Sequence, residues 1–275
     1  MTPRHVQTRL GAAALLCGAA LSLAPLAARA QASDDWKFQG SVYLYLPSIG
    51  GTTTFPPGGG GSSVGIDGSK LLEDFKFALM GSLEANKGAW GVFGDAIYLD
   101  FGDTRSGTRD IAIGGLLPVG ASANTEYDLR GWLVTLAGSW RAVSSPAYRL
   151  DVLGGTRMLN ITTSLTWQLS GNIGSIALAD RAGSREARQQ NWDAIVGAKG
   201  RASFGEGGRW FVPYYVDIGA GESKFTWQAT TGLGYTFPWG DVVGAWRYID
   251  YRFKSSSTIE SLTFNGPGIA AVFRW

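Results

Sequence analysis

Cysteine and histidine are almost absent from this sequence of 275 residues, because each occurs once, at Cys17 and His5. The chain after position 17 can therefore form neither a disulfide nor a thiolate metal site. It also lacks the imidazole that most often serves as a general base or activates a nucleophile. We expect no enzymatic activity, no catalytic residue, no metal site and no cofactor.

Charge is scarce as well, at 17% of residues, and it is balanced. Without the three arginines of residues 1–30, the 24 basic residues fall to 21, against 22 acidic ones. Nucleic-acid binding needs clustered cations, so we expect no nucleic-acid partner. Beyond residue 30 no apolar run reaches the roughly 18 residues of a membrane-spanning helix, which excludes a helical membrane protein.

The first thirty residues have the pattern of a secretory signal peptide. Arg4 and Arg9 precede a stretch without charge, and Ala28-Arg29-Ala30 is an A-x-A cleavage pattern. We predict a signal peptide over residues 1–30 and a mature protein over residues 31–275. A membrane-spanning helix is the alternative for this stretch, and Pro25 and the many small residues argue against it.

Glycine and aromatic residues are abundant: the chain has 40 Gly, 11 Trp, 10 Tyr and 13 Phe, a composition that suits strands and turns. Apolar side chains recur at every second position in ten segments, which predicts ten strands. Eight or twelve strands remain alternatives, because the stretch from Gly51 to Phe55 could also pair. The ten segments are Trp36 to Leu46, Phe75 to Asn86, Trp90 to Phe101, Tyr127 to Ala142, Tyr148 to Gln168, Asn191 to Phe204, Trp210 to Gly221, Lys224 to Phe237, Val242 to Phe253 and Thr258 to Trp275.

The connections between these segments alternate in length. Tight turns at Asn86 to Gly88, Ser144 to Pro146, Gly205 to Gly208 and Trp239 to Asp241 alternate with mostly longer links, among them residues 48–74, 102–126 and 170–190. This alternation is typical of outer-membrane barrels. We predict an all-β fold: a closed, antiparallel, up-and-down transmembrane β-barrel with short periplasmic turns and longer extracellular loops.

Tryptophan gathers near the predicted strand ends, where aromatic side chains of a barrel meet the lipid headgroups. A soluble β core filled by these side chains is the alternative. Trp167, Trp192 and Trp227 lie near the long loops and are candidates for the opposite rim. The predicted girdle at the short-turn rim is Trp36, Trp90, Trp140, Trp210, Trp239 and Trp275.

The other row of each strand carries polar residues that we expect to face the lumen. Ions inside a barrel of ten strands are expected to pair, so we favour a lumen filled by polar side chains. A narrow pore for small solutes is the alternative. The predicted lumen residues are Lys37, Gln39, Arg149, Asp151, Arg157, Asp193, Lys199, Asp217, Gln228 and Arg247.

The chain ends on alternating hydrophobic residues, with Ile269, Phe273 and Trp275 on one face. We expect this face to contact lipid while the last strand pairs with the first and leaves no free edge. The pattern is similar to the terminal signal for barrel assembly, with Trp275 where phenylalanine is commoner.

Two short motifs could indicate a function, but for each we prefer an interpretation without one. Gly61 to Gly65 matches G-x-S-x-G, but it lies in a glycine-rich stretch predicted as a loop and has no histidine partner. Arg181, Arg185 and Arg188 in the predicted loop 180–190 are candidates for binding glycolipid phosphates, and a solvated loop is the preferred interpretation.

Five stretches carry a family resemblance: WKFQGSVYLYLPSIGG, GDAIYLDFGD, LRGWLVTLAGSWR, WDAIVGAKGR and FVPYYVDIGAGESKFTWQATTGLGYTFPWGDVVGAWRYIDYRF. They resemble uncharacterised proteobacterial outer-membrane β-barrel proteins of the OmpA/OmpW-like class. The resemblance covers nearly the whole mature chain and implies a Gram-negative outer-membrane location. It supplies no functional residue.

The sequence thus predicts an integral outer-membrane barrel without enzymatic activity, with a structural or surface-interaction role. The expected partners are outer-membrane lipid, lipopolysaccharide and, during biogenesis, the barrel-assembly machinery. A diffusion pore and a soluble periplasmic β protein are the alternatives.

Overall fold

The computed structural model describes residues 35–53, 62–66, 75–107, 121–173, 176–254 and 259–275. The described residues form twelve strands and a three-residue 3-10 helix, η1 (Glu206–Gly208). No helix among them is long and apolar enough to cross a membrane. The strands are β1 (Trp36–Tyr45), β2 (Ser48–Thr53), β3 (Ser62–Ile66), β4 (Phe75–Lys87), β5 (Trp90–Gly107), β6 (Ala121–Ser144), β7 (Tyr148–Ile173), β8 (Ile176–Phe204), β9 (Trp210–Gly221), β10 (Phe225–Phe237), β11 (Gly240–Arg252) and β12 (Ile259–Arg274).

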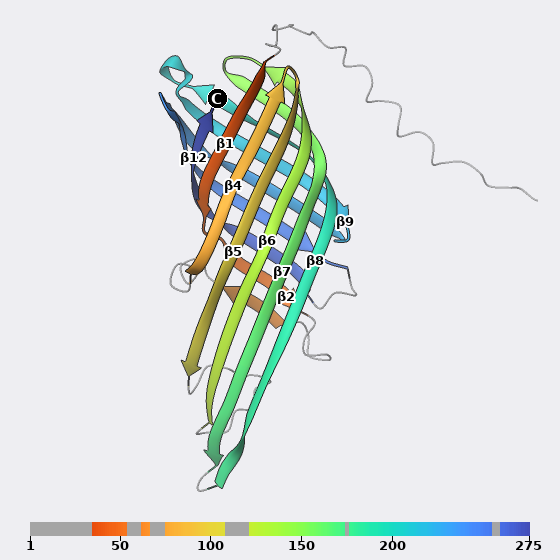
Figure 1. Cartoon of the computed structure of the whole chain (residues 1–275), viewed down its shortest axis with the longest axis vertical. Coiled ribbons are helices and arrows are strands. Elements are labelled where there is room, and N and C mark those ends of the chain that lie inside the picture. The colour runs from red at the N-terminus through yellow and green to blue at the C-terminus, as the bar shows by residue number, and fades with distance from the viewer. Residues whose placement is uncertain (1–34, 54–61, 67–74, 108–120, 174–175, 255–258) are drawn as a thin grey trace, which may run out of the picture. The chain divides into compact units, whose positions relative to one another are not determined.

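Ten of these strands close into an antiparallel barrel (Figure 1). From β4 to β12 each strand pairs with its neighbour in sequence, and β1 pairs with both β4 and β12. Val42 lies opposite Gly81 on one side and opposite Ala271 on the other. The predicted fold class and the pairing of the last strand with the first are confirmed.

Alternation along each strand explains why the sheet has an exposed face and a filled interior. On β6, Trp132, Leu136 and Trp140 are 40%, 53% and 44% exposed, whereas the intervening Leu133 and Thr135 are buried. Side chains at odd and even positions point to opposite faces of a strand, so the apolar row of β6 lies on the outer wall.

The short turns lie at one end of the barrel and begin with glycine where the backbone requires it. Gly88, in the link from β4 to β5, and Gly205, in the link from β8 to β9, have φ angles of 60° and 73°. Such positive φ angles favour glycine because it has no Cβ atom.

Strand β2 continues the path of β1 along β12, with Ile49 opposite Phe264, and then pairs with β3. Pro47 separates the two strands, and its missing N–H is consistent with the interruption. The pairing that we considered for Gly51 to Phe55 is therefore present in β2 as far as Thr53. The G-x-S-x-G residues from Ser62 onward lie in strand β3, so our assignment of them to a loop was wrong.

Four consecutive strands, β5 to β8, are much longer than a membrane requires (Figure 1). Strand β8 has 29 residues, whereas about 9 to 11 suffice to cross a bilayer. Residues 102–107, 121–126, 170–173 and 176–190 are strand, so the prediction of loops there was wrong. Backbone pairing such as that between Thr162 and Arg188 does not depend on apolar side chains, which were the signal that we used.

Candidate functional site in the barrel lumen

Ionic side chains fill the lumen near the short turns. Asp151 accepts from Arg141 at 2.9 Å and from Arg149 at 2.8 Å. Arg149 also donates to Glu84 at 2.7 Å, and Glu84 pairs with Lys199. The Asp151 and Glu84 carboxylates thus join strands β4, β6, β7 and β8 into one network.

A second ionic group lies at the same end of the barrel. Asp241, the second residue of β11, is 1% exposed. It accepts from Arg201 at 3.3 Å and from both terminal nitrogens of Arg274, one of them at 2.9 Å. Arg274 also donates to Gln39 at 3.2 Å, which ties the last strand to the first.

Two further ion pairs lie deeper along the same strands. Arg247 of β11 donates to Asp95 of β5 at 2.7 Å and to Gln228 at 3.2 Å. Arg157 of β7 pairs with Asp217 of β9, and both side chains are fully buried. Burial of an ion is tolerable when it is paired and hydrogen-bonded. Both pairs are hydrogen-bonded, but Nε of Arg247, one terminal nitrogen of Arg157 and Oδ1 of Asp217 have no hydrogen-bond partner.

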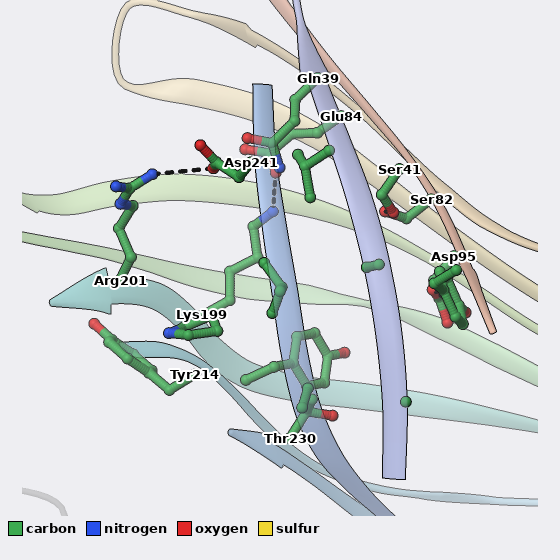
Figure 2. Close-up of a pocket in the computed structure, with 18 of the residues that line it drawn as sticks. Gln39, Ser41, Ser82, Glu84, Asp95, Lys199, Arg201, Tyr214, Thr230 and Asp241 are labelled. Atoms are coloured by element: carbon green, nitrogen blue, oxygen red, sulfur yellow. Dashed lines mark hydrogen bonds and ion pairs between the residues drawn. The ribbon is translucent and has the colours of Figure 1, made fainter. Parts of the chain in front are cut away.

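Between the ionic networks at the rim and the Arg247–Asp95 pair lies a cavity of about 280 Å³ (Figure 2). Its polar lining includes Glu84, Asp95, Lys199, Arg201 and Asp241. Its apolar lining includes Phe93, Phe211, Tyr215, Val243 and Val272. We call this cavity the vestibule.

Beyond these ion pairs, the inward side chains of several strands become apolar, whereas β8 keeps the buried polar residue Asn191 opposite Leu159. On β5, β7 and β11, Ile97, Leu159 and Ile249 follow directly after Asp95, Arg157 and Arg247 in the inward row. All members of this apolar cluster are 8% exposed or less, and they enclose a space of only about 30 Å³. The cluster consists of Tyr45, Ile49, Met80, Ile97, Leu129, Leu133, Leu159, Ile161, Ile249, Tyr251, Phe253, Leu262 and Phe264.

The structure brings most of the predicted lumen residues together in this region. Arg157 and Asp217 form their buried pair, and Asp193 accepts from the Ser223 backbone N–H at 2.8 Å. Lys37, by contrast, is exposed at the start of β1. The predicted residues that line the vestibule are Gln39, Arg149, Asp151, Lys199, Gln228 and Arg247.

Several residues of the lumen were missed by the sequence reasoning. Glu84, Arg201 and Arg274 have the inward parity of their strands, and that signal was available. Asp241 was missed because we began its strand at Val242 and placed Asp241 in the preceding turn, whereas β11 begins two residues earlier, at Gly240. The apolar cluster was missed because we assumed a polar inward row along the whole length of each strand.

The six tryptophans of the predicted girdle are all outward and 44–70% exposed. Trp90 lies opposite Trp140 across β5 and β6, and Trp275 stacks on Phe38 with ring centroids 6.1 Å apart. Trp192, a candidate for the other rim, is 46% exposed, and the rings of Trp227 and Tyr248 are tilted against each other with their centroids 4.7 Å apart. The side chain of Trp167 lies outside the described residues.

Three acidic residues of the strands, Asp95, Asp217 and Asp250, each have interaction partners of their own. Asp95 and Asp217 belong to different ion pairs, and Asp250 interacts with Thr263 and Arg252 on another face. No group of three or more histidine, cysteine or acidic side chains in the described part of the chain could hold a metal ion.

The chain matches no protein-family model and no curated protein. Among solved structures it is similar to the outer membrane protease OmpT from Escherichia coli, with 11% identity, a TM-score of 0.53, and coverage of 88% of this chain and 97% of that chain. At this identity the likeness shows the fold alone, a ten-stranded barrel of the kind found in outer-membrane proteins.

Two more distant matches cover similar shares. The translocator domain of the autotransporter NalP from Neisseria meningitidis has 11% identity and a TM-score of 0.27, covering 87% of this chain and 88% of that chain. The Pseudomonas putida toluene transporter TodX has 11% identity and a TM-score of 0.27, covering 88% of this chain and 90% of that chain. Scores this low carry no argument about function.

Proposed function

We propose that this protein is an integral outer-membrane barrel that does not conduct and that serves a structural or surface-interaction role. The outward row of β6, from Trp132 through Leu136 to Trp140, supports a lipid-facing wall with aromatic residues at both edges. The expected partners are outer-membrane lipid, lipopolysaccharide and the assembly machinery. The signal peptide over residues 1–30 and the absence of enzymatic activity are part of this proposal.

The apolar cluster is the observation that carries the proposal of a closed lumen. Its space of about 30 Å³ is small and lined almost entirely by apolar groups, so it offers water few of the polar partners that buried water needs. Solutes and hydrated ions would have to displace buried side chains such as Leu159, at 1% exposure, and Ile249, at 0%.

The projecting strands β5 to β8 support a role at the cell surface. On the outer face, polar residues follow Trp132 of β6 and Trp192 of β8 toward the projecting ends, as Arg130 and Arg188 illustrate. Charged side chains on the outer face of a barrel are tolerated near or beyond the interface and disfavoured in the hydrocarbon. These strands would therefore extend out of the membrane and present a sheet to partners there.

A narrow diffusion pore is the second candidate, favoured by the 280 Å³ vestibule. Planar-bilayer recording on refolded protein separates the two. We expect no reproducible single-channel steps from the native sequence, and steps from the triple variant Leu159→Ala, Ile249→Ala, Phe264→Ala. Reproducible steps from the native sequence, abolished by changing Arg157 or Arg247, would establish the pore instead.

The membrane location has its own test. We expect the protein to fractionate with the outer membrane, to need detergent for extraction, and to migrate differently on a gel when it is not boiled. Release from cells as a water-soluble monomer would contradict the proposal and support the soluble β-protein alternative.

A further inference from the structure

The vestibule is a blind cavity whose entrance lies at the short-turn rim. Beyond its floor, Arg247 and Asp95, the apolar cluster fills the lumen. At the rim, the side chains of Arg149, Arg201 and Arg274 are 30%, 26% and 41% exposed. A ligand would therefore reach the cavity from the end of the barrel where the short turns and the C-terminal strand lie.

The rim of the vestibule carries more positive than negative charge. The ion pairs at this end join five cations, Arg141, Arg149, Lys199, Arg201 and Arg274, to only three carboxylates, Asp151, Glu84 and Asp241. Every carboxylate is shared by two cations. The lining of the vestibule itself leaves out Arg141 and includes the floor pair of Arg247 and Asp95, so it carries five cations to four carboxylates. An excess of one positive charge in a recess with low-dielectric walls raises the local concentration of anions.

The walls of the vestibule are largely apolar below this charged rim. Phe211, Val243 and Val272 pack into one wall, with Ala245 partly buried against them. The guanidinium of Arg201 lies 3.8 Å from the centroid of the Phe211 ring, so a cationic group and an apolar surface adjoin at the same place. A ligand with an anionic end and an apolar body matches this arrangement.

The floor presents one further polar group. Arg247 lines the vestibule, and its terminal nitrogens bond to Asp95, Tyr43 and Gln228. The Nε atom of this buried arginine has no hydrogen-bond partner. Because this atom is buried, a ligand oxygen could reach it only if the Arg247 side chain shifted, and the floor otherwise presents a guanidinium that is already paired with Asp95.

We propose that the vestibule binds a small organic carboxylate with an apolar body, which enters from the short-turn end. The ligand's carboxylate contacts the guanidinium groups of Arg201 and Arg274, which both pair with Asp241. The apolar body of the ligand packs on Phe211 and Val243. A cavity of about 280 Å³ lies near the lower limit of ligand pockets, roughly 300 Å³, which restricts the ligand to a small molecule. Binding of this kind does not depend on whether the barrel conducts.

Titration calorimetry with benzoate as the probe tests this proposal on refolded protein in a zwitterionic detergent. We expect saturable binding of benzoate. The affinity for benzamide, which has the same shape without the charge, should be lower by a factor of about ten or more. Acetate and inorganic phosphate test whether the charge alone suffices, and we expect both to bind more weakly than benzoate. Equal affinity for benzoate and benzamide would overturn the proposal, as would binding of phosphate in preference to benzoate.

Two variants locate the binding site. Arg201→Gln removes one rim cation and should weaken benzoate binding about tenfold, the equivalent of one lost charged hydrogen bond. The matched control is Arg188→Gln on β8, outside the barrel lumen, where the side chain is 64% exposed and binding should not change. Equal effects of the two substitutions would contradict the proposal.

The second variant, Ala245→Phe, fills the vestibule while it keeps every charge, and it should abolish benzoate binding. Unboiled gel migration checks that each variant is folded. If Arg201→Gln fails to fold, the comparison of benzoate with benzamide and the Ala245→Phe variant still decide the outcome. Undiminished binding by folded Ala245→Phe protein would show that the vestibule is not the site.

Discussion

Arg247 and Asp95 form an ion pair of 2.7 Å that joins β11 to β5 across the lumen. The two residues are 152 positions apart in the sequence, and their side chains are only 10% and 8% exposed. Tyr43 of β1 donates to the same carboxylate at 2.7 Å. This contact therefore links three strands, and it divides the vestibule from the apolar cluster.

Removal of one member of this pair should destabilise the barrel strongly. Arg247→Met leaves the Asp95 carboxylate buried without its cation, which typically costs about 3–5 kcal/mol. The double variant Arg247→Met, Asp95→Leu should recover most of that loss, because an apolar pair carries no unpaired charge. Urea unfolding in detergent measures both, and a double variant as unstable as the single one would contradict this explanation.

The matched control for this prediction is Arg188→Met. Arg188 lies 3.5 Å from Glu186, and their side chains are 64% and 56% exposed. Exposed pairs contribute about 0–1 kcal/mol, so this change should leave the unfolding midpoint almost unaltered.

A charge in the middle of the outward row of β6 should be poorly tolerated. Leu136 lies midway between Trp132 and Trp140 on the outer face and is 53% exposed. In a lipid-facing wall, Leu136→Arg should cost about 2–4 kcal/mol of folding free energy in a bilayer. The control is Ala142→Arg, beyond the Trp140 rim, with an expected cost of about 0–1 kcal/mol. Equal costs for the two substitutions would indicate that no hydrocarbon contacts Leu136.

Assembly of the barrel should require an aromatic side chain at position 275. Trp275 is 66% exposed, stacks on Phe38, and exchanges backbone hydrogen bonds with it at 2.9 and 3.2 Å. We expect Trp275→Phe to assemble as well as the native chain and deletion of Trp275 to reduce the heat-modifiable barrel in outer membranes. Normal assembly after the deletion would show that Trp275 does not serve as a signal.

The outward-facing half of the fold could be predicted from the sequence because it has a one-dimensional signal. Apolar residues at alternate positions mark the strands between the two rims, and tryptophans such as Trp90 and Trp140 mark their ends. This signal fades in β5 to β8 beyond the rim opposite the short turns, where polar residues occupy both faces. Strand pairing there depends on backbone hydrogen bonds, which no side-chain period reveals.

The lumen could be predicted only in part, because the partners of each ion pair depend on the register of the whole sheet. The inward parity of Arg157 and Asp217 followed from alternation, but their pairing across β7 and β9 did not. The apolar cluster escaped prediction for a different reason. On β11 the inward Ile249 and Tyr251 are as apolar as an outward row, so composition alone did not tell which face they occupy.

The central claim is that the lumen is open at the short-turn end and closed beyond Arg247, and cysteine accessibility tests it most directly. The chain has no cysteine after position 17, so each introduced thiol is the only one in the mature segment that we predict. Thr230 lines the vestibule, whereas Ile249 lies in the apolar cluster at 0% exposure. In folded protein we predict that a small water-soluble thiosulfonate modifies the Thr230→Cys variant and leaves the Ile249→Cys variant unmodified until urea unfolds it. Modification of both variants at similar rates in the folded barrel would contradict the claim.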